Sequence, residues 1–254
     1  MSRDDLTRDP NHVAFDDRTA EADGAGGPGA ADDDTVRAEH SRGPGLRRVL
    51  LGVGALLAAA LLFVAGWFVG RPSWPDDTSP DAGFARDMQV HHAQAVSMSL
   101  TVRSAAGVGS DVQTLAYDIA TTQENQRGQM RGWLEIWGLP VARSEAPMAW
   151  MERAGHGHRG GEPMLMPDGR MPGMASKAQL DRLASLRGDP AEVLYLQLMI
   201  PHHRSGVTMA KACVSSCHQP NVVALARTMV EGQQAEIRLM TGMLRERGAP
   251  VPPA

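Results

Sequence analysis

A duplicated segment constrains the fold of this chain more than any other feature of its sequence. Residues 88–99 read MQVHHAQAVSMS, and residues 199–210 read MIPHHRSGVTMA. A methionine, a histidine pair and a second methionine therefore recur at a constant offset of 111 positions. Each copy is followed by a second matching segment, in which Leu115-Ala116 corresponds to Leu225-Ala226 and Gln123 to Gln233. Such a repeat indicates two copies of one supersecondary unit.

Apolar residues in both copies follow helical periodicity, with alternating steps of four and three residues. We expect helices from about Asp81 to Ala106, from an N-cap at Ser110 to Trp137, from Asp189-Pro190 onward and from Gln219-Pro220 onward, with a short helix from Ser176 to Arg187. Short turns make consecutive helices antiparallel. The sequence thus predicts an all-α fold, a four-helix domain over residues 81–248 made of two duplicated helical hairpins, 81–140 and 189–248, joined by a Met- and His-rich loop at 141–175.

The segment before this domain predicts a membrane anchor. Residues 1–48 are poor in large apolar side chains and are expected to form a disordered cytoplasmic tail. Residues 49–70 carry no charge and are long enough to span a bilayer core of about 30 Å as one transmembrane helix. Arg42, Arg47 and Arg48 precede it and Asp76 and Asp77 follow, which predicts a cytoplasmic N-terminus and an extracytoplasmic domain. A cleaved signal peptide has a shorter apolar region, so we expect an uncleaved signal anchor with an extended spacer at 71–80.

Composition and motifs argue against several classes of function. The chain has 254 residues and a formal net charge of −4, with no dense basic patch interleaved with aromatic residues, which disfavours nucleic acid as a partner. It contains no glycine-rich phosphate loop, nucleophile elbow or zincin motif. Di-iron carboxylate chemistry would need a Glu three residues before the bundle histidines, and Met88, Gln89, Met199 and Ile200 stand at those positions instead.

Polar residues interrupt the helical stripes at duplicated places. Residues equidistant from a hairpin turn lie at the same height, which puts His91 level with Gln126 and His202 level with Glu236 in one polar layer. Imidazole suits copper, zinc, iron and nickel, whereas thioethers select Cu(I). Met88, Met130, Met199 and Met240 are expected to form one thioether layer about a turn away. The candidate metal ligands are His91, His92, His202, His203, Glu236, Met88, Met199, Met98, Met209, Met130 and Met240.

A structural interpretation of the same residues stays open. A hydrogen-bonded His, Glu and Gln layer can fix helix register with no metal, and methionine stripes are commonly adaptable core residues. His92 and His203 lie one position off the stripe, and the sequence allows them either to flank the site or to face solvent.

The joining loop is a second candidate site, because a Met and His cluster can wrap Cu(I) or Ag(I). Its candidate ligands are Met148, Met151, His156, His158, Met164, Met166, Met171 and Met174. An incidental methionine-containing linker is the alternative.

Cys213 and Cys217 are the only cysteines. On a helix their Cα atoms would lie about 6 Å apart, which a disulfide can span, and an extracytoplasmic location favours oxidation. A thiolate metal site with His218 is the second interpretation. Haem attachment is a remote third, because the segment has one residue more than Cys-x-x-Cys-His.

These motifs resemble the DUF305 family of secreted or membrane-anchored bacterial proteins. The similarity extends from about Asp81 to Gly248 and includes Met-Pro-Gly-Met at 171–174; it departs from the family pattern at Val90, where the second copy has Pro201. The resemblance implies a ferritin-like helical bundle and, for Met- and His-rich members, a link to copper.

The leading hypothesis is a membrane-anchored, extracytoplasmic protein that binds copper, or silver, for buffering or resistance. An envelope-structural or interaction module whose polar layer only specifies helix packing is the second hypothesis, and a redox or hydrolytic enzyme is a weaker third. The sequence names neither the metal nor a protein partner.

Overall fold

The structure, a computed structural model, describes residues 44–70, 73–142, 145–156 and 164–253. The chain divides into two compact units, one ending at Gly70 and the other beginning at Arg71. Most of the predicted disordered tail, residues 1–43, lies outside the described residues.

The first unit contains a single described helix, α1 (Pro44–Val69). Its segment Gly45–Val69 is long and apolar enough to cross a membrane, and its leucine, valine and phenylalanine side chains are exposed. The helix thus agrees with the expected span at residues 49–70 and begins about a turn earlier.

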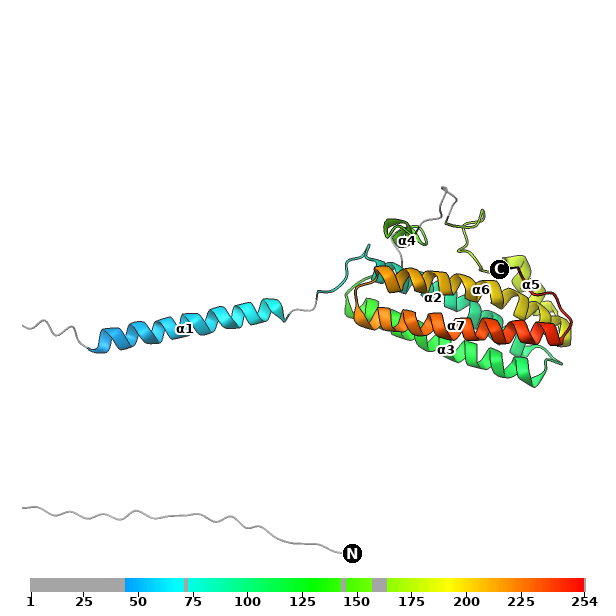
Figure 1. The fold of residues 1–254 in the computed structure, drawn as a ribbon, viewed down its shortest axis with the longest axis horizontal. Helices are drawn as coiled ribbons and strands as arrows, with labels where there is room; N and C mark the ends of the chain where they lie inside the picture. Colours follow the sequence, from blue (N-terminus) through cyan, green and yellow to red (C-terminus); the bar gives the residue numbers. More distant parts are fainter. Residues whose placement is uncertain (1–43, 71–72, 143–144, 157–163, 254) are drawn as a thin grey trace, which may run out of the picture. The chain divides into compact units, whose positions relative to one another are not determined.

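The second unit is all-helical in its described residues and is built from the two expected hairpins (Figure 1). The first hairpin comprises α2 (Pro80–Ser104) and α3 (Ser110–Ile136), and the second comprises α6 (Gly188–Ser216) and α7 (Pro220–Glu246). Between them lie α4 (Ala149–Arg153) and α5 (Lys177–Ser185). The short α4 was not expected from the sequence, which predicts an irregular loop there.

Side-chain caps set several of the helix ends. The Ser79 hydroxyl accepts a hydrogen bond from the Ala82 backbone N–H, and Pro80 occupies the first turn of α2, where its missing N–H costs nothing. Ser176 and Gln179 form a reciprocal capping box at the start of α5. The expected N-cap at Ser110 is wrong by one position: Gly109 caps α3, without a side-chain bond.

The two hairpins are related by an approximate two-fold rotation. Helices α2 and α6 pack antiparallel: the Gly188 backbone N–H at the start of α6 donates to the Ala106 carbonyl just after α2. At the other end, the Asp81 carboxylate in α2 accepts hydrogen bonds from the His218 and Gln219 backbone N–H groups. Because equivalent residues meet across antiparallel helices, the axis runs perpendicular to α2 and α6.

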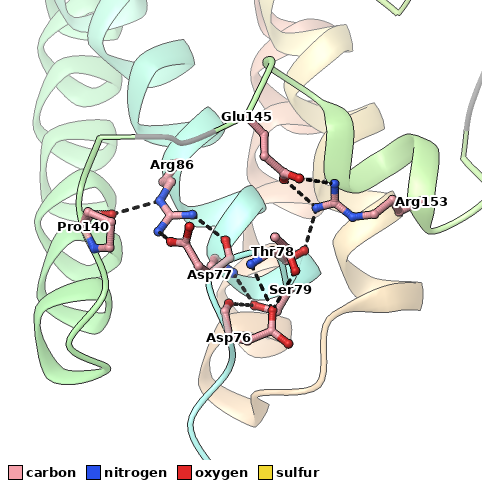
Figure 2. A network of polar contacts seen from close by, with 9 residues as sticks. Asp76, Asp77, Thr78, Ser79, Arg86, Pro140, Glu145 and Arg153 are labelled. Carbon is pink, nitrogen blue, oxygen red and sulfur yellow. Dashed lines mark hydrogen bonds and ion pairs between the residues drawn. The ribbon is translucent and has the colours of Figure 1, made fainter.

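The segment before α2 is fixed to the bundle, although the sequence predicts a simple spacer (Figure 2). The buried Arg86 guanidinium forms an ion pair with Asp77 and donates to the Asp77 and Pro140 carbonyls. Arg153 in α4 forms an ion pair with Glu145 and donates to the Thr78 carbonyl. Residues 77–78 are therefore tied both to the end of the first hairpin and to α4.

Candidate metal centre

Two histidines, one from each hairpin, meet where α2 crosses α6. The rings of His91 and His202 stack with centroids 3.7 Å apart and planes inclined by 28°. The Nε2 atom of His202 lies 2.9 Å from the backbone carbonyl oxygen of His91, so Nε2 carries the proton and donates. The two-fold axis passes between these two rings, which occupy equivalent positions in the repeat.

The neighbouring histidines contact the outer helix of their own hairpin. The His92 Nε2 atom lies 2.8 Å from Gln126 Oε1, and the His203 Nε2 atom lies 2.7 Å from Glu236 Oε2. Both acceptors are oxygens, which places the proton on Nε2 in each ring. The expected pairs, His91 with Gln126 and His202 with Glu236, are therefore wrong by one residue. The second histidine of each pair takes that contact, and neither faces solvent, since all four rings are buried.

These contacts leave several buried polar atoms without a hydrogen-bond partner among the described residues. They are both ring nitrogens of His91, the Nδ1 atoms of His92, His202 and His203, the Oε1 atoms of Gln123 and Gln233, and the Nε atom of Arg127. Buried polar groups in folded proteins are usually paired, so these atoms call for a ligand, a proton donor or bound water. We call the eight polar side chains at this level the histidine cluster: His91, His92, Gln123, Gln126, His202, His203, Gln233 and Glu236.

Gly206 makes room for one member of the cluster. A β-carbon at this position would lie 2.3 Å from Gln233 Oε1, so the amide occupies the space that any side chain at 206 would fill. The equivalent position in the first copy is Ala95. The two halves of the cluster are thus similar but not identical, and they also differ in charge, with Gln126 facing one histidine and Glu236 the other.

Burial keeps the imidazoles of His91, His92 and His202 in their neutral form. Desolvation, followed by the charges of neighbouring histidines, holds the pKa of His91 and of His202 well below 6.5. Desolvation lowers the pKa of His92 to about 3, although its hydrogen bond with Gln126 acts in the opposite direction. A neutral imidazole offers a nitrogen lone pair, which is the form that metals require.

The donors of the cluster fit a transition metal by chemistry, but they do not converge on one point. Within the described ranges, no three His, Cys, Asp or Glu side chains are grouped as a metal-holding set. The rings of His91 and His202 are stacked, so the lone pairs of their nitrogens, which lie in the ring planes, are not directed at each other.

The methionines expected in one layer lie in two, on opposite sides of the histidine cluster. Met88 and Met130 belong to one buried cluster and Met199 and Met240 to the other, with Met209 joining the first and Met98 the second. The single thioether layer is therefore a wrong expectation, because a two-fold axis perpendicular to the helices carries each methionine to the far side of the histidines. We call the methionines of the first group the methionine cluster; its members are Met88, Met130, Met148, Met151, Met164, Met171, Met209 and Met229.

Half of the methionine cluster comes from the joining segment, whose residues the sequence assigned to a separate loop site. Met148, Met151, Met164 and Met171 are buried against the bundle. Met174 is partly buried beside them and Met166 is 41% exposed. The His156 Nε2 atom lies 3.0 Å from the Ser215 hydroxyl oxygen, and the His156 backbone N–H donates to the Met151 carbonyl. His158 lies outside the described residues.

Cys213 and Cys217 form a disulfide, with Cα atoms 4.9 Å apart. Helix α6 ends at Ser216, so Cys217 stands at the C-cap in extended conformation rather than on the helix. The His218 side chain is 83% exposed.

Residues that the sequence reasoning left out of the site include Gln123 and Gln233. Their equivalence in the repeat was visible, and a buried amide recurring one turn before Gln126 and Glu236 is a signal that could have included them. Asp87 was also missed: its Oδ2 atom accepts hydrogen bonds from the Met148 backbone N–H at 2.7 Å and from Trp150 Nε1 at 3.0 Å.

Known proteins share both the sequence and this architecture. A protein of the same family from Streptomyces coelicolor is 50% identical in a solved structure, with 70% of this chain and 100% of that chain aligned and a TM-score of 0.62. A fragment from Deinococcus radiodurans is 31% identical over 69% of this chain and 99% of its own, with a TM-score of 0.53. CopM in its Cu(II)-bound form is 24% identical over 66% of this chain and 97% of its own, with a TM-score of 0.50, which shows a common fold.

A mimivirus protein, uncharacterized protein L153 of Acanthamoeba polyphaga mimivirus, is 42% identical over 53 residues. The aligned part is 21% of this chain and spans only about a third, 35%, of the viral protein. The family described as Domain of unknown function (DUF305) matches residues 81–244, which include both hairpins, the joining segment and the histidine cluster. The chain belongs to the DUF305 family.

Proposed function

We propose that this protein binds a copper-class transition-metal ion at the histidine cluster and serves in metal buffering or resistance. The observation that carries the proposal is the set of five imidazole nitrogens that are buried without a hydrogen-bond partner among the described residues. Leaving such groups unpaired costs free energy, roughly 1–3 kcal/mol for each. A bound cation would satisfy several of them at once.

The donor types select the metal. Neutral imidazoles suit copper in both of its common oxidation states, and thioethers select the soft ions Cu(I) and Ag(I). Met88, Met130 and Met209 on one side of the histidines, and Met98, Met199 and Met240 on the other, supply thioethers to both faces of the cluster. CopM, a solved protein with the same fold, has a Cu(II)-bound form.

Metal binding at the cluster requires the imidazoles to turn. His91 has no hydrogen bond from either ring nitrogen to a described residue, so its ring is the one least restrained by polar contacts. The His203–Glu236 pair supplies a carboxylate at the edge of the cluster, because the Glu236 side chain is 25% exposed while His203 is fully buried. A bound ion would supply Lewis-acid or electron-transfer chemistry, and His91, His92, His202, His203 and Glu236 would hold it and shield it from water.

The proposed location is outside the cytoplasm, with α1 as the membrane anchor. Helix α1 has the required length and composition, and Arg47 and Arg48 stand at its start. The disulfide between Cys213 and Cys217 is of a kind that persists in oxidising compartments. In this arrangement residues 1–48 form the cytoplasmic tail, and residues 81–248 form the exported metal-binding domain.

The test is a Cu(I) titration of the full-length chain in detergent, against a competing chelator of known affinity. We expect at least one tightly held ion in the wild type and its loss in the double variant His91→Gln/His202→Gln. The matched control is His156→Gln/His218→Gln, which removes two histidines outside the cluster. Equal binding by wild type, variant and control would overturn the proposal.

A structural role is the second candidate, and the hydrogen bonds favour it. His92–Gln126 and His203–Glu236 each join the two helices of one hairpin, and His202 with the His91 carbonyl joins the hairpins to each other. If the cluster only fixes packing, the His91→Gln/His202→Gln variant will lose thermal stability with no difference between metal-loaded and metal-free protein.

A further inference from the structure

The methionine cluster differs in composition from the half of the core that the duplication makes equivalent to it. The half of the core that holds the methionine cluster contains these eight methionines, and among its described residues only Leu134 and Val222 are buried Leu, Ile or Val residues. The opposite half contains four methionines and nine buried Leu, Ile and Val residues. The bundle helices contribute four methionines to each half, so the difference in methionine content comes from the joining segment, which has no counterpart in the repeat.

The surplus methionines come from the segment that joins the hairpins, and α4 brings two of them. Met148 precedes α4 with φ at +67°, a left-handed conformation that residues with a β-carbon rarely adopt. Its backbone N–H donates to the Asp87 carboxylate, which holds it in this conformation, and its side chain is 3% exposed within the cluster. Met151 follows on α4 and is equally buried.

Helix α4 is docked on α2 by contacts specific to its position. A β-carbon at Gly83 would lie 2.5 Å from Cβ and Cγ of Trp150, so only glycine allows the indole to approach the helix this closely. The same indole donates from Nε1 to Asp87 and packs edge-on against Phe84, with ring centroids 5.9 Å apart. Met148 and Met151 thereby join the same buried cluster as Met88 of α2 and Met209 of α6.

We propose that the methionine cluster is a second metal site, which takes a soft monovalent cation, Cu(I) or Ag(I), between the thioethers of α4 and those of α2 and α6. Thioether sulfur is a soft, uncharged ligand, and it favours such ions over hard cations such as Mg²⁺. The site is distinct from the histidine cluster, because it requires no imidazole and uses residues of a segment that does not contribute to that cluster.

Silver nitrate is the probe, since Ag(I) does not change oxidation state during the measurement. The full-length chain in detergent, with its disulfide intact and in chloride-free buffer, is titrated against a competing chelator. We expect the near-isosteric double variant Met148→Leu/Met151→Leu to bind one Ag(I) ion fewer per chain than the wild type. The control Met166→Leu/Met243→Leu removes one exposed and one buried methionine outside the cluster and keeps the wild-type stoichiometry.

A second variant addresses the same site without removing sulfur. Gly83→Ala should displace Trp150 and with it α4, so this variant should also bind one Ag(I) ion fewer per chain. If Met148→Leu/Met151→Leu does not fold, Gly83→Ala alone tests the methionine cluster. Wild-type stoichiometry in both variants overturns the inference.

The two sites fail separately in this design. An Ag(I) ion lost from His91→Gln/His202→Gln but kept in Met148→Leu/Met151→Leu supports only the histidine cluster, and the reverse pattern supports only the methionine cluster.

Discussion

His91 and His202, equivalent residues of the two repeats, stack on each other with ring centroids 3.7 Å apart. Their contact marks the two-fold axis that relates the hairpins, so a single position of the ancestral unit meets its own copy there. Polar side chains surround this contact at one level of the bundle, and apolar clusters rich in methionine lie on either side.

Truncating one of these rings should destabilise the fold. His202→Ala removes the stacked ring and the hydrogen bond to the His91 carbonyl, and it leaves a cavity in a fully buried place. We expect a loss of about 3 kcal/mol in the free energy of unfolding, from the cavity and the lost hydrogen bond. Chemical denaturation of metal-free protein measures this loss of free energy.

The control is His218→Ala, at an exposed histidine, which should change the free energy of unfolding by less than about 0.5 kcal/mol. Similar losses in both variants would contradict the central role of the stack.

The hairpins and their order were predictable, because the repeat and the helical period act locally. Each long helix starts or ends within a few residues of Pro, Gly or Ser signals, as at Pro80, Gly138 and Pro220. The short α4 was not predictable, because Met148 has an unfavourable backbone conformation that the tertiary contact with Asp87 maintains.

The composition of the polar layer was predictable only in part. Counting residues from the turns assumes ideal, straight helices, and an error of one position exchanges His91 for His92 as the partner of Gln126. The direction of the two-fold axis was invisible in the sequence. An axis along the bundle would have gathered Met88 and Met199 on one side of the histidines, whereas the perpendicular axis separates them.

Stability should fall in acid as the buried histidines are forced to titrate. Burial holds the pKa of His91 and His202 well below 6.5 and lowers that of His92 to about 3. Below pH 6.5 the unfolded chain therefore binds more protons than the folded chain, and stability is complete only above that pH. Each such histidine should cost about 2 kcal/mol between pH 7 and pH 5.

Denaturant midpoints at several pH values, in the presence of a metal chelator, test this dependence. The variant His92→Gln should show a shallower loss between pH 7 and pH 5, and the control His156→Gln should keep the wild-type slope. A midpoint that does not change over this range would show that the histidines are not buried in neutral form.

Two glycines of the joining segment provide a matched test of how closely that segment packs on α6. Gly169 and Gly173 both have positive φ, at +81° and +75°. A β-carbon at Gly173 would lie 2.4 Å from the Pro201 carbonyl oxygen, whereas one at Gly169 would have no neighbour within 4 Å. Gly169→Ala should cost about 1 kcal/mol from backbone conformation alone, and Gly173→Ala about 3 kcal/mol, because the backbone must also shift. Equal melting temperatures for the two variants would argue against the close contact between the segment and Pro201.

The two hairpins should be held together at both ends by equivalent carboxylates. Asp81 accepts from the His218 and Gln219 N–H groups, and the equivalent Glu192 accepts from the Gly109 N–H at 2.6 Å while it pairs with Arg247. In each case an acidic residue in the first turns of one hairpin's inner helix binds the turn of the other hairpin, and both side chains are buried. Asp81→Ala and Glu192→Ala should therefore each cost about 2–3 kcal/mol, because partly buried backbone donors lose a charged acceptor. Since the residues lie at opposite ends of the domain, the losses should add in the double variant to within about 0.5 kcal/mol. Denaturation of the single and double variants measures this sum. If the double variant is as stable as the less stable of the two single variants, the two ends do not act independently. Docking of the two hairpins would then depend on the level of the histidines alone.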